Sequence, residues 1–183
     1  IKIINMKKNT GHARCIAAGL KYINDNEKFD YVIPMDGDGE DLPSEIGSIL
    51  CKAYDNPGNA ITGNRIKRSE GFIFRFCYTA HKYLTFILTG QSIKFGNFSC
   101  LPQHVVKKMT IEPATWSSFS GSLSKLENIK FSISSTRGSR YFDPSKMSFI
   151  NLIKHSLSII AVFKKTFMTR SILFLIIYFP KFF

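Results

Sequence analysis

The most informative segment is Tyr31-Val-Ile-Pro-Met-Asp-Gly-Asp-Gly-Glu-Asp-Leu-Pro43, in which an apolar run passes directly into acidic residues and glycines. An apolar run that ends in this way predicts a buried strand opening into a loop. Asp36 and Asp38 then lie at the carboxyl end of a strand, where open α/β sheets bind their ligands. Two carboxylates one residue apart can both ligate one hard divalent cation, which would stabilise a diphosphate leaving group. A solvated polar turn is the alternative, since Asp and Gly are ordinary turn residues.

The segments around this loop alternate between strand-like and helix-like patterns. Residues 2–6 and 60–63 predict short strands, whereas residues 13–23 and 44–54 carry the apolar spacing of helices. The resulting order of strand, helix, strand, helix, strand is typical of a parallel sheet in an α/β domain. We therefore predict the α/β class.

The rest of the chain predicts further elements and a distinct C-terminal region. A helix is predicted at residues 72–88, strands at 94–101 and 130–134, and a short helix at 104–109. From residue 148 onward the sequence predicts a helix with few acidic groups, typical of an amphipathic helix on a membrane surface. A buried core helix is the alternative there. The last apolar run, at 172–179, is too short to span a bilayer and predicts a truncated membrane segment.

Composition limits the classes of partner. The chain has 183 residues, of which 44% are hydrophobic, and a formal net charge of +12. It can therefore bury a core, and its charge implies an anionic partner such as nucleic acid, a phosphorylated substrate or a membrane surface. No helix-turn-helix, zinc-finger or RNP-type pattern is visible, so we expect lipid phosphate or a membrane rather than nucleic acid. The four cysteines are irregularly spaced, which predicts free and mostly buried thiols and no zinc site.

Five short motifs are spread over most of residues 1–165. They are Asn9-Thr-Gly11 followed by Ala13 and Gly19, Met35-Asp-Gly-Asp-Gly-Glu-Asp-Leu-Pro43, Gly63-Asn-Arg-Ile-Lys-Arg68, Phe95-Gly-Asn-Phe-Ser99 and Arg137-Gly-Ser-Arg-Tyr141. In this order and spacing they resemble the inverting family 2 glycosyltransferases. Within that family they resemble the polyprenyl-phosphate sugar synthases related to dolichol-phosphate-mannose synthase.

The resemblance implies a fold and a division of the chain. The family has the GT-A fold, a Rossmann-like and mostly parallel sheet flanked by helices. On this basis residues 1–147 form the GT-A domain, without the family's first strand. Residues 148–183 then form a membrane-associated helical segment, also truncated, and the protein lies at the cytoplasmic face of a membrane.

The resemblance also implies a reaction and its partners. A sugar passes from a nucleotide-diphosphate sugar to an acceptor, with inversion at the anomeric carbon and with Mg²⁺ or Mn²⁺ as cofactor. The expected acceptor is polyprenyl phosphate. By motif position, the expected metal ligands are Asp36, Asp38 and Glu40, and hard carboxylate oxygens suit these ions.

Site residues are carried over motif by motif. The expected catalytic residues are Asp38, Asn97 and Arg137, and the expected substrate-binding residues are Asn9, Gly11, Asp36, Arg65, Arg68 and Arg140. Arginine forks match phosphate oxygens, and an anionic lipid phosphate needs no strong base. Many relatives have Asp where Asn97 stands, and Asn can form hydrogen bonds but cannot act as a base. His12 could touch phosphate, although a histidine at a helix start is more often a cap or a surface residue.

Three other functions stay open at this point. The acceptor could be a growing polysaccharide or another glycan, whose hydroxyl would need a general base. The chain could be an inactive or truncated remnant that acts as a basic membrane-surface module. It could also bind nucleic acid in a salt-dependent manner.

Overall fold

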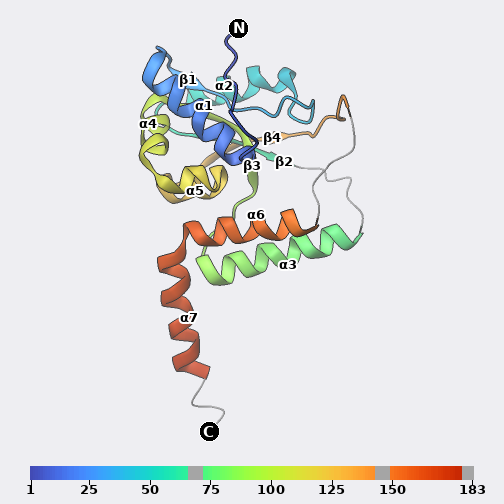
Figure 1. Ribbon diagram of the computed structural model, residues 1–183, viewed down its shortest axis with the longest axis vertical. Helices are drawn as coiled ribbons and strands as arrows, with labels where there is room; N and C mark the ends of the chain where they lie inside the picture. The colour runs from blue at the N-terminus through green and yellow to red at the C-terminus, as the bar shows by residue number, and fades with distance from the viewer. Residues whose placement is uncertain (66–71, 143–148, 179–183) are drawn as a thin grey trace. The chain divides into compact units, whose positions relative to one another are not determined.

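In the computed structural model, which describes residues 1–65, 72–142 and 149–178, the chain divides into two compact units. Unit 1 comprises Ile1–Arg68 and Lys94–Lys146, and unit 2 comprises Ser69–Ile93 and Met147–Phe183 (Figure 1). The helix at residues 72–89, which the sequence interpretation assigned to the first domain, therefore belongs to the second unit. Each unit is described separately below.

Unit 1 is built on a four-stranded sheet with the order β1-β3-β2-β4. The strands are β1 (Tyr31–Val32), β2 (Ile61–Arg65), β3 (Phe95–Pro102) and β4 (Phe131–Ser135). β3 runs antiparallel to both β1 and β2, whereas β2 and β4 are parallel. The predicted α/β class is confirmed. Among the described strands, β1, β2 and β4 run in one direction and β3 runs opposite between β1 and β2, so the sheet is mixed with one reversed strand.

Helices cover both faces of this sheet. α2 (Ile46–Asp55), which follows the short 3₁₀ helix η1 (Pro43–Glu45), contacts β2, β3 and β4. α4 (Gln103–Ile111) and α5 (Phe119–Leu126) contact β3, and α1 (His12–Asn26) packs on α4. The predicted helices at 13–23, 44–54 and 104–109 are thus confirmed.

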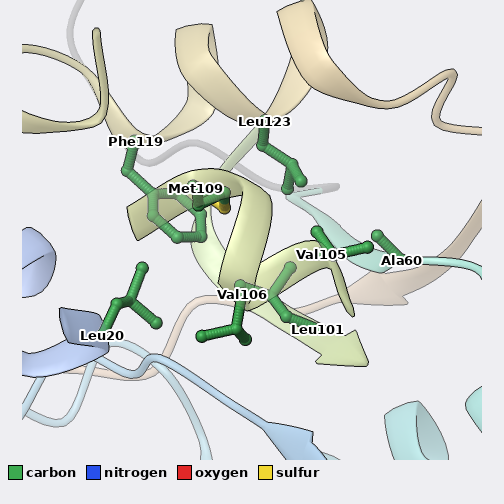
Figure 2. Close-up of a cluster of buried hydrophobic side chains, with 8 residues drawn as sticks. All are labelled: Leu20, Ala60, Leu101, Val105, Val106, Met109, Phe119 and Leu123. Carbon is green, nitrogen blue, oxygen red and sulfur yellow. The ribbon is translucent and has the colours of Figure 1, made fainter. Parts of the chain in front are cut away.

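Two hydrophobic clusters form the core of unit 1, one on each face of the sheet. One contains Leu20, Ala60, Leu101, Val105, Val106, Met109, Phe119 and Leu123 (Figure 2), and the other contains Ile49, Ala53, Ile61, Phe98 and Cys100. Neighbouring residues of one strand therefore belong to different clusters, because successive side chains of a strand point to opposite faces. This alternation holds the strand ends, and hence the loops that follow them, in fixed positions.

Two parts of unit 1 differ from the sequence prediction. Residues 2–6 form no strand, and Ile3 is 80% exposed. They pair with none of the described strands, and an unpaired segment has no ladder of hydrogen bonds to hold it extended. Conversely, α5 and the 3₁₀ helix η2 (Pro113–Trp116) were not predicted. Ser118 is the N-cap of α5, and its hydroxyl accepts the Gly121 N–H. The serines within α5 interrupt the apolar spacing from which a helix would be predicted.

Unit 2 consists of α3 (Phe72–Thr89), α6 (Phe149–Val162) and α7 (Lys164–Tyr178), and α3 packs against both of the others. The predicted helix from residue 148 is in fact two helices that meet at the buried Phe163. Arg170 of α7 donates to the carbonyl oxygens of Phe86 and Ile87, at 3.1 and 2.8 Å, at the end of α3. The Phe86 carbonyl also accepts the Gly90 N–H at 2.7 Å, and the guanidinium adds a cation at this C-terminal end of the helix, which it caps.

The surface of α7 is apolar over its second half. Residues 172–178 are all apolar and all exposed, so this part of the helix has no polar face. Among the described residues, no helix combines the length and the apolar character needed to cross a bilayer.

Candidate functional site

The acidic loop, residues 36–42, leaves the edge of the sheet after β1. At its start, Asp36 receives contacts from residues far away in the sequence: His12 Nε2 lies 3.0 Å from Asp36 Oδ1 and Asn97 Nδ2 lies 3.3 Å from the same oxygen. Arg65, from the end of β2, lies 3.8 Å from Oδ2. The structure therefore brings the predicted residues Asp36, Arg65 and Asn97 together.

These contacts set the charge of Asp36. The hydrogen bond with His12 is the main cause that lowers the pKa of Asp36, and Asn97 and Arg65 act in the same direction against the effect of burial. The same hydrogen bond raises the pKa of His12 above its ordinary value. Asp36 is therefore held as an anion at neutral pH.

Two carboxylates of the acidic loop shape its main chain. The buried Asp41 accepts the Asp36 N–H at 2.9 Å and contacts Arg65 at 3.4 Å. Asp38 accepts the Glu40 N–H at 3.1 Å. Burial raises the pKa of Asp41, and Arg65 opposes that effect. Sequence reasoning gave Asp41 no role, because a bond from Asp36 to a carboxylate five residues later depends on the exact path of the loop.

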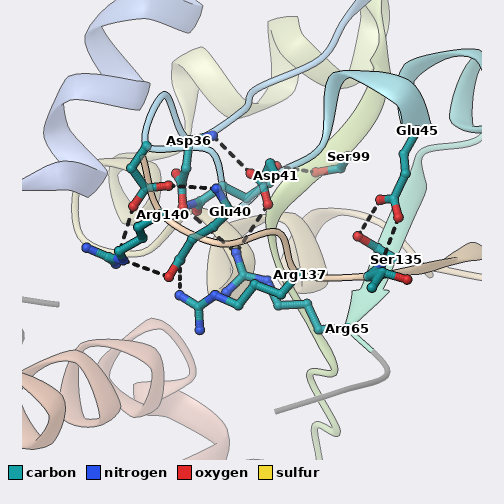
Figure 3. Close-up of polar contacts among 12 residues, drawn as sticks. Asp36, Glu40, Asp41, Glu45, Arg65, Ser99, Ser135, Arg137 and Arg140 are labelled. Atoms are coloured by element: carbon teal, nitrogen blue, oxygen red, sulfur yellow. Dashed lines mark hydrogen bonds and ion pairs between the residues drawn. The ribbon is translucent and has the colours of Figure 1, made fainter. Parts of the chain in front are cut away.

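The arginine segment, residues 136–142, lies against the acidic loop (Figure 3). Arg137 and Arg140 both pair with Glu40, with Arg140 Nε 2.7 Å from Oε1, and Arg140 also lies 3.3 Å from Asp38 Oδ2. The main chain adds two hydrogen bonds. The Gly138 N–H donates to the main-chain carbonyl oxygen of Glu40 at 3.0 Å, and the Tyr141 N–H donates to that of Asp38 at 2.9 Å. The two predicted arginines are thus both brought to Glu40, and Arg140 also to Asp38.

Glu45 anchors the beginning of the arginine segment. Its carboxylate accepts the Ser135 hydroxyl at 2.6 Å and the Thr136 N–H at 2.8 Å (Figure 3). Glu45 belongs to η1, directly after the acidic loop, and Ser135 is the last residue of β4. Nothing in the local sequence pattern indicated this role, because the partners are 90 residues apart.

The contact between the two segments requires glycine. A Cβ at Gly138 would lie 2.4 Å from the Gly39 carbonyl oxygen and 2.7 Å from Leu42 Cδ2. Gly39 has φ +91, a conformation that residues with a side chain rarely adopt, and the Tyr141 ring lies where its Cβ would be. Both positions therefore depend on the absence of a side chain.

The donor set suits a hard cation in part. Glu40 is engaged by two arginines, and the described residues contain no group of three or more His, Cys, Asp or Glu placed to hold a metal ion. The set of Asp36, Asp38 and Glu40 as metal ligands stays a prediction. Asp36 and Asp38 are 20% and 34% exposed, and two accessible carboxylates fit Mg²⁺ or Mn²⁺ when diphosphate and water supply the other oxygens.

The other predicted site residues shape the turn before α1 or lie elsewhere. Asn9 Oδ1 accepts the Gly11 N–H at 3.1 Å, and Gly11, with φ +94, leads directly into α1. Arg68 lies outside the described residues. Cys15, Cys51 and Cys100 are free as predicted, but Cys15 and Cys51 are exposed, so the expectation of mostly buried thiols is wrong for them; the side chain of Cys77 is not among those described. Burial raises the pKa of Cys100 to about 11, so that thiol is not reactive.

Comparison with known proteins agrees with this arrangement. The model of glycosyl transferase family 2 matches residues 1–105. A stretch of 65 residues is 34% identical to an uncharacterized protein of Methanocaldococcus jannaschii, over 36% of this chain and 28% of that protein. The match therefore spans just over a quarter of the relative's length. No solved structure matches the chain significantly. From its acidic loop, its α/β sheet and the family match over more than half of its length, this chain belongs to family 2 of the glycosyltransferases.

Proposed function

We propose that this protein transfers a sugar from a nucleotide-diphosphate sugar to an acceptor, with inversion at the anomeric carbon and with Mg²⁺ or Mn²⁺ as cofactor. The observation that carries the proposal is the meeting of three carboxylates of the acidic loop, Asp36, Asp38 and Glu40, with three arginines from two other segments of unit 1. Carboxylates for a metal and arginines for phosphate are both needed at a diphosphate site.

Asp36 and Asp38 are the residues that would hold the cation. A bound cation would neutralise charge on the diphosphate leaving group. Asp38 keeps one oxygen near Arg140 and the other on the Glu40 N–H, so its orientation is fixed from both sides. Such orientation before binding lowers the reorganisation needed in the transition state.

Arg65, Arg137 and Arg140 are the residues that would bind phosphate oxygens. Each is now paired with a carboxylate of the acidic loop, so an incoming phosphate would compete for the guanidinium groups. Arg137 and Arg140 share the Glu40 carboxylate, so the two cations lie close together, and burial and the neighbouring Arg140 lower the pKa of Arg137. A pair of adjacent arginines favours a dianionic ligand.

We further propose polyprenyl phosphate as the acceptor. Asn97 lies beside Asp36, at the position where many relatives of the resembling group have Asp, and it cannot remove a proton from a hydroxyl. An anionic phosphate oxygen needs no such base, and its attack depends on alignment and charge stabilisation. The exposed apolar end of α7 and the net charge of +12 support a position at the cytoplasmic face of a membrane.

A thermal-shift titration of the purified chain with UDP, GDP and their sugars, with and without Mn²⁺, tests the donor site. A ligand that binds only the native state raises the melting temperature. At a hundredfold excess over its Kd it increases the free energy of unfolding by about 2.7 kcal/mol. We expect a Mn²⁺-dependent rise with one of the two bases. Asp38→Asn should lose it, and Asp55→Asn, which removes an exposed carboxylate at the end of α2, should keep it.

Two results would contradict the proposal. A chain that melts cooperatively and shows no shift with any nucleotide would favour the inactive remnant. A shift that is equal in wild type and Asp38→Asn would show that the nucleotide binds elsewhere.

A further inference from the structure

Two side chains, from two other segments of unit 1, contact the same oxygen of Asp36. His12 is the first residue of α1, and Asn97 lies in β3. His12 Nε2 is 3.0 Å from Asp36 Oδ1, Asn97 Nδ2 is 3.3 Å from the same oxygen, and Asn97 Nδ2 is 3.4 Å from His12 Nδ1. The three side chains therefore form a closed network.

The chemistry of the groups fixes the direction of each bond. A carboxylate oxygen only accepts, so the Asn97 amide must turn its nitrogen toward Asp36. The same nitrogen faces His12 Nδ1, so in the neutral imidazole Nδ1 accepts and the proton on Nε2 donates to Asp36. This assignment follows from the network, in which every donor meets an acceptor.

The turn before α1 delivers His12 to this place. The bond from the Gly11 N–H to Asn9 Oδ1 and the positive φ of Gly11 bring the chain into the helix so that His12 begins it. The His12 side chain is 60% exposed, whereas Asp36 is 20% exposed. The ring thus binds a mostly buried carboxylate from the solvent side.

We propose that His12 is a positioning residue for donor binding, in that its Nε2–H holds Asp36 Oδ1 and leaves Oδ2 as the oxygen that serves the donor or its cation. This inference rests on the proposed function. Oδ2 is the oxygen nearer to Arg65, at 3.8 Å, so it lies on the side where phosphate is expected. Asn97 supports His12 by fixing its tautomer.

The test compares substitutions that keep or lose a donor at the position of Nε2. The amide nitrogen of Gln reaches about as far as Nε2, whereas that of Asn reaches only as far as Nδ1. We expect His12→Gln to bind the nucleotide within about threefold of wild type, and His12→Asn and His12→Ala to bind it roughly tenfold more weakly, the size of one charged hydrogen bond. The measurement is the Kd for UDP and for GDP in the presence of Mn²⁺, by titration calorimetry. His104→Ala, which changes an exposed histidine of α4, is the matched control and should not alter the Kd.

The outcomes separate this inference from the proposed function. If wild type binds a nucleotide and all His12 variants bind it equally well, the inference is wrong and the proposed function stands. The inference is also wrong if His12→Gln binds as weakly as His12→Ala, because the Nε2 donor would then not be what matters. If wild type binds neither nucleotide, both fail. Should His12→Ala not fold, the comparison of His12→Gln with His12→Asn, which differ by one methylene, still decides.

Discussion

Among single residues, Gly138 has the tightest surroundings in the site. Its α-carbon faces the carbonyl oxygen of Gly39 so closely that a methyl group would lie 2.4 Å from it. Gly37, two residues before Gly39 in the same loop, has nothing within 4 Å of where its Cβ would be. The two positions therefore give a matched pair for the same substitution.

Gly138→Ala should lower the free energy of unfolding by about 1–3 kcal/mol, because the added methyl group must push the arginine segment away from the acidic loop. Gly37→Ala should leave stability unchanged or raise it slightly, because Ala restricts the unfolded chain without a clash. Urea unfolding of the two variants measures the difference. An equal effect of both substitutions would show that the close approach of the two segments does not limit stability.

The site residues that could be predicted from the sequence are those that lie in or directly after a strand, because open α/β sheets bind their ligands at strand ends. Asp36, Arg65 and Asn97 follow or lie in neighbouring strands, so the sheet brings them together. Asp41 and Glu45 escaped prediction, because their roles are hydrogen bonds to main-chain or side-chain groups whose positions depend on loop geometry. Local pattern has no signal for such bonds.

At the scale of elements, most helices and strands of unit 1 follow from apolar periodicity, which is a local property. β3 was predicted at 94–101 and is observed at Phe95–Pro102, yet its antiparallel direction was not foreseen. Direction depends on where a strand enters the sheet, and neighbouring residues do not encode this. Likewise, the apolar pattern after residue 148 continues through Phe163, so it could not show that two helices meet there.

Glu112 offers a test of how a short element is stabilised. Its carboxylate accepts the Ala114 N–H at 3.1 Å, which caps η2, and it pairs with Lys125 of α5 at 2.8 Å. The hydrogen bond with Lys125 is the main cause that lowers the pKa of Glu112 below its ordinary value of 4.5. A lowered pKa in the folded state stabilises the protein above the unfolded value and loses that contribution as pH falls through the folded value.

Glu112→Gln should therefore melt at a lower temperature than wild type at pH 7, with a loss of up to about 1 kcal/mol from the ion pair, since the Gln oxygen can still accept the Ala114 N–H. The gap should shrink as the pH falls below 4.5, because the wild-type carboxylate then takes up a proton. Melting curves of both proteins from neutral to acid pH measure this. A gap that stays constant over that range would mean that the charge of Glu112 contributes nothing.

At the scale of the whole molecule, a net charge of +12 occurs together with an exposed apolar helix end. Positive charge attracts any polyanion, and salt screens this attraction. Binding through apolar surface buried in a membrane is not screened by salt. Salt dependence can therefore separate a membrane surface from nucleic acid.

The full chain should sediment with vesicles that contain phosphatidylglycerol and much less with pure phosphatidylcholine, because the anionic surface attracts its basic groups. Raising the salt should weaken this binding on the order of tenfold and leave a resistant fraction, since α7 also inserts apolar side chains. Exchange of Phe174 and Leu175 for Ser should remove that fraction. Equal binding to duplex DNA and to anionic vesicles, with the same loss in salt, would instead favour nucleic acid.

The two main-chain bonds between the acidic loop and the arginine segment have a consequence for how this site can change over time. The Gly138 and Tyr141 N–H groups donate to the oxygens of Glu40 and Asp38, and main-chain groups are the same whatever side chain a residue carries. Mutation can therefore replace the side chain at 139 while the backbone keeps its alignment with Asp38 and Glu40. Such a site can acquire a new acceptor by drift at this position while Arg137 and Arg140 stay in place for the donor, which makes position 139 the natural one to randomise when a new specificity is sought.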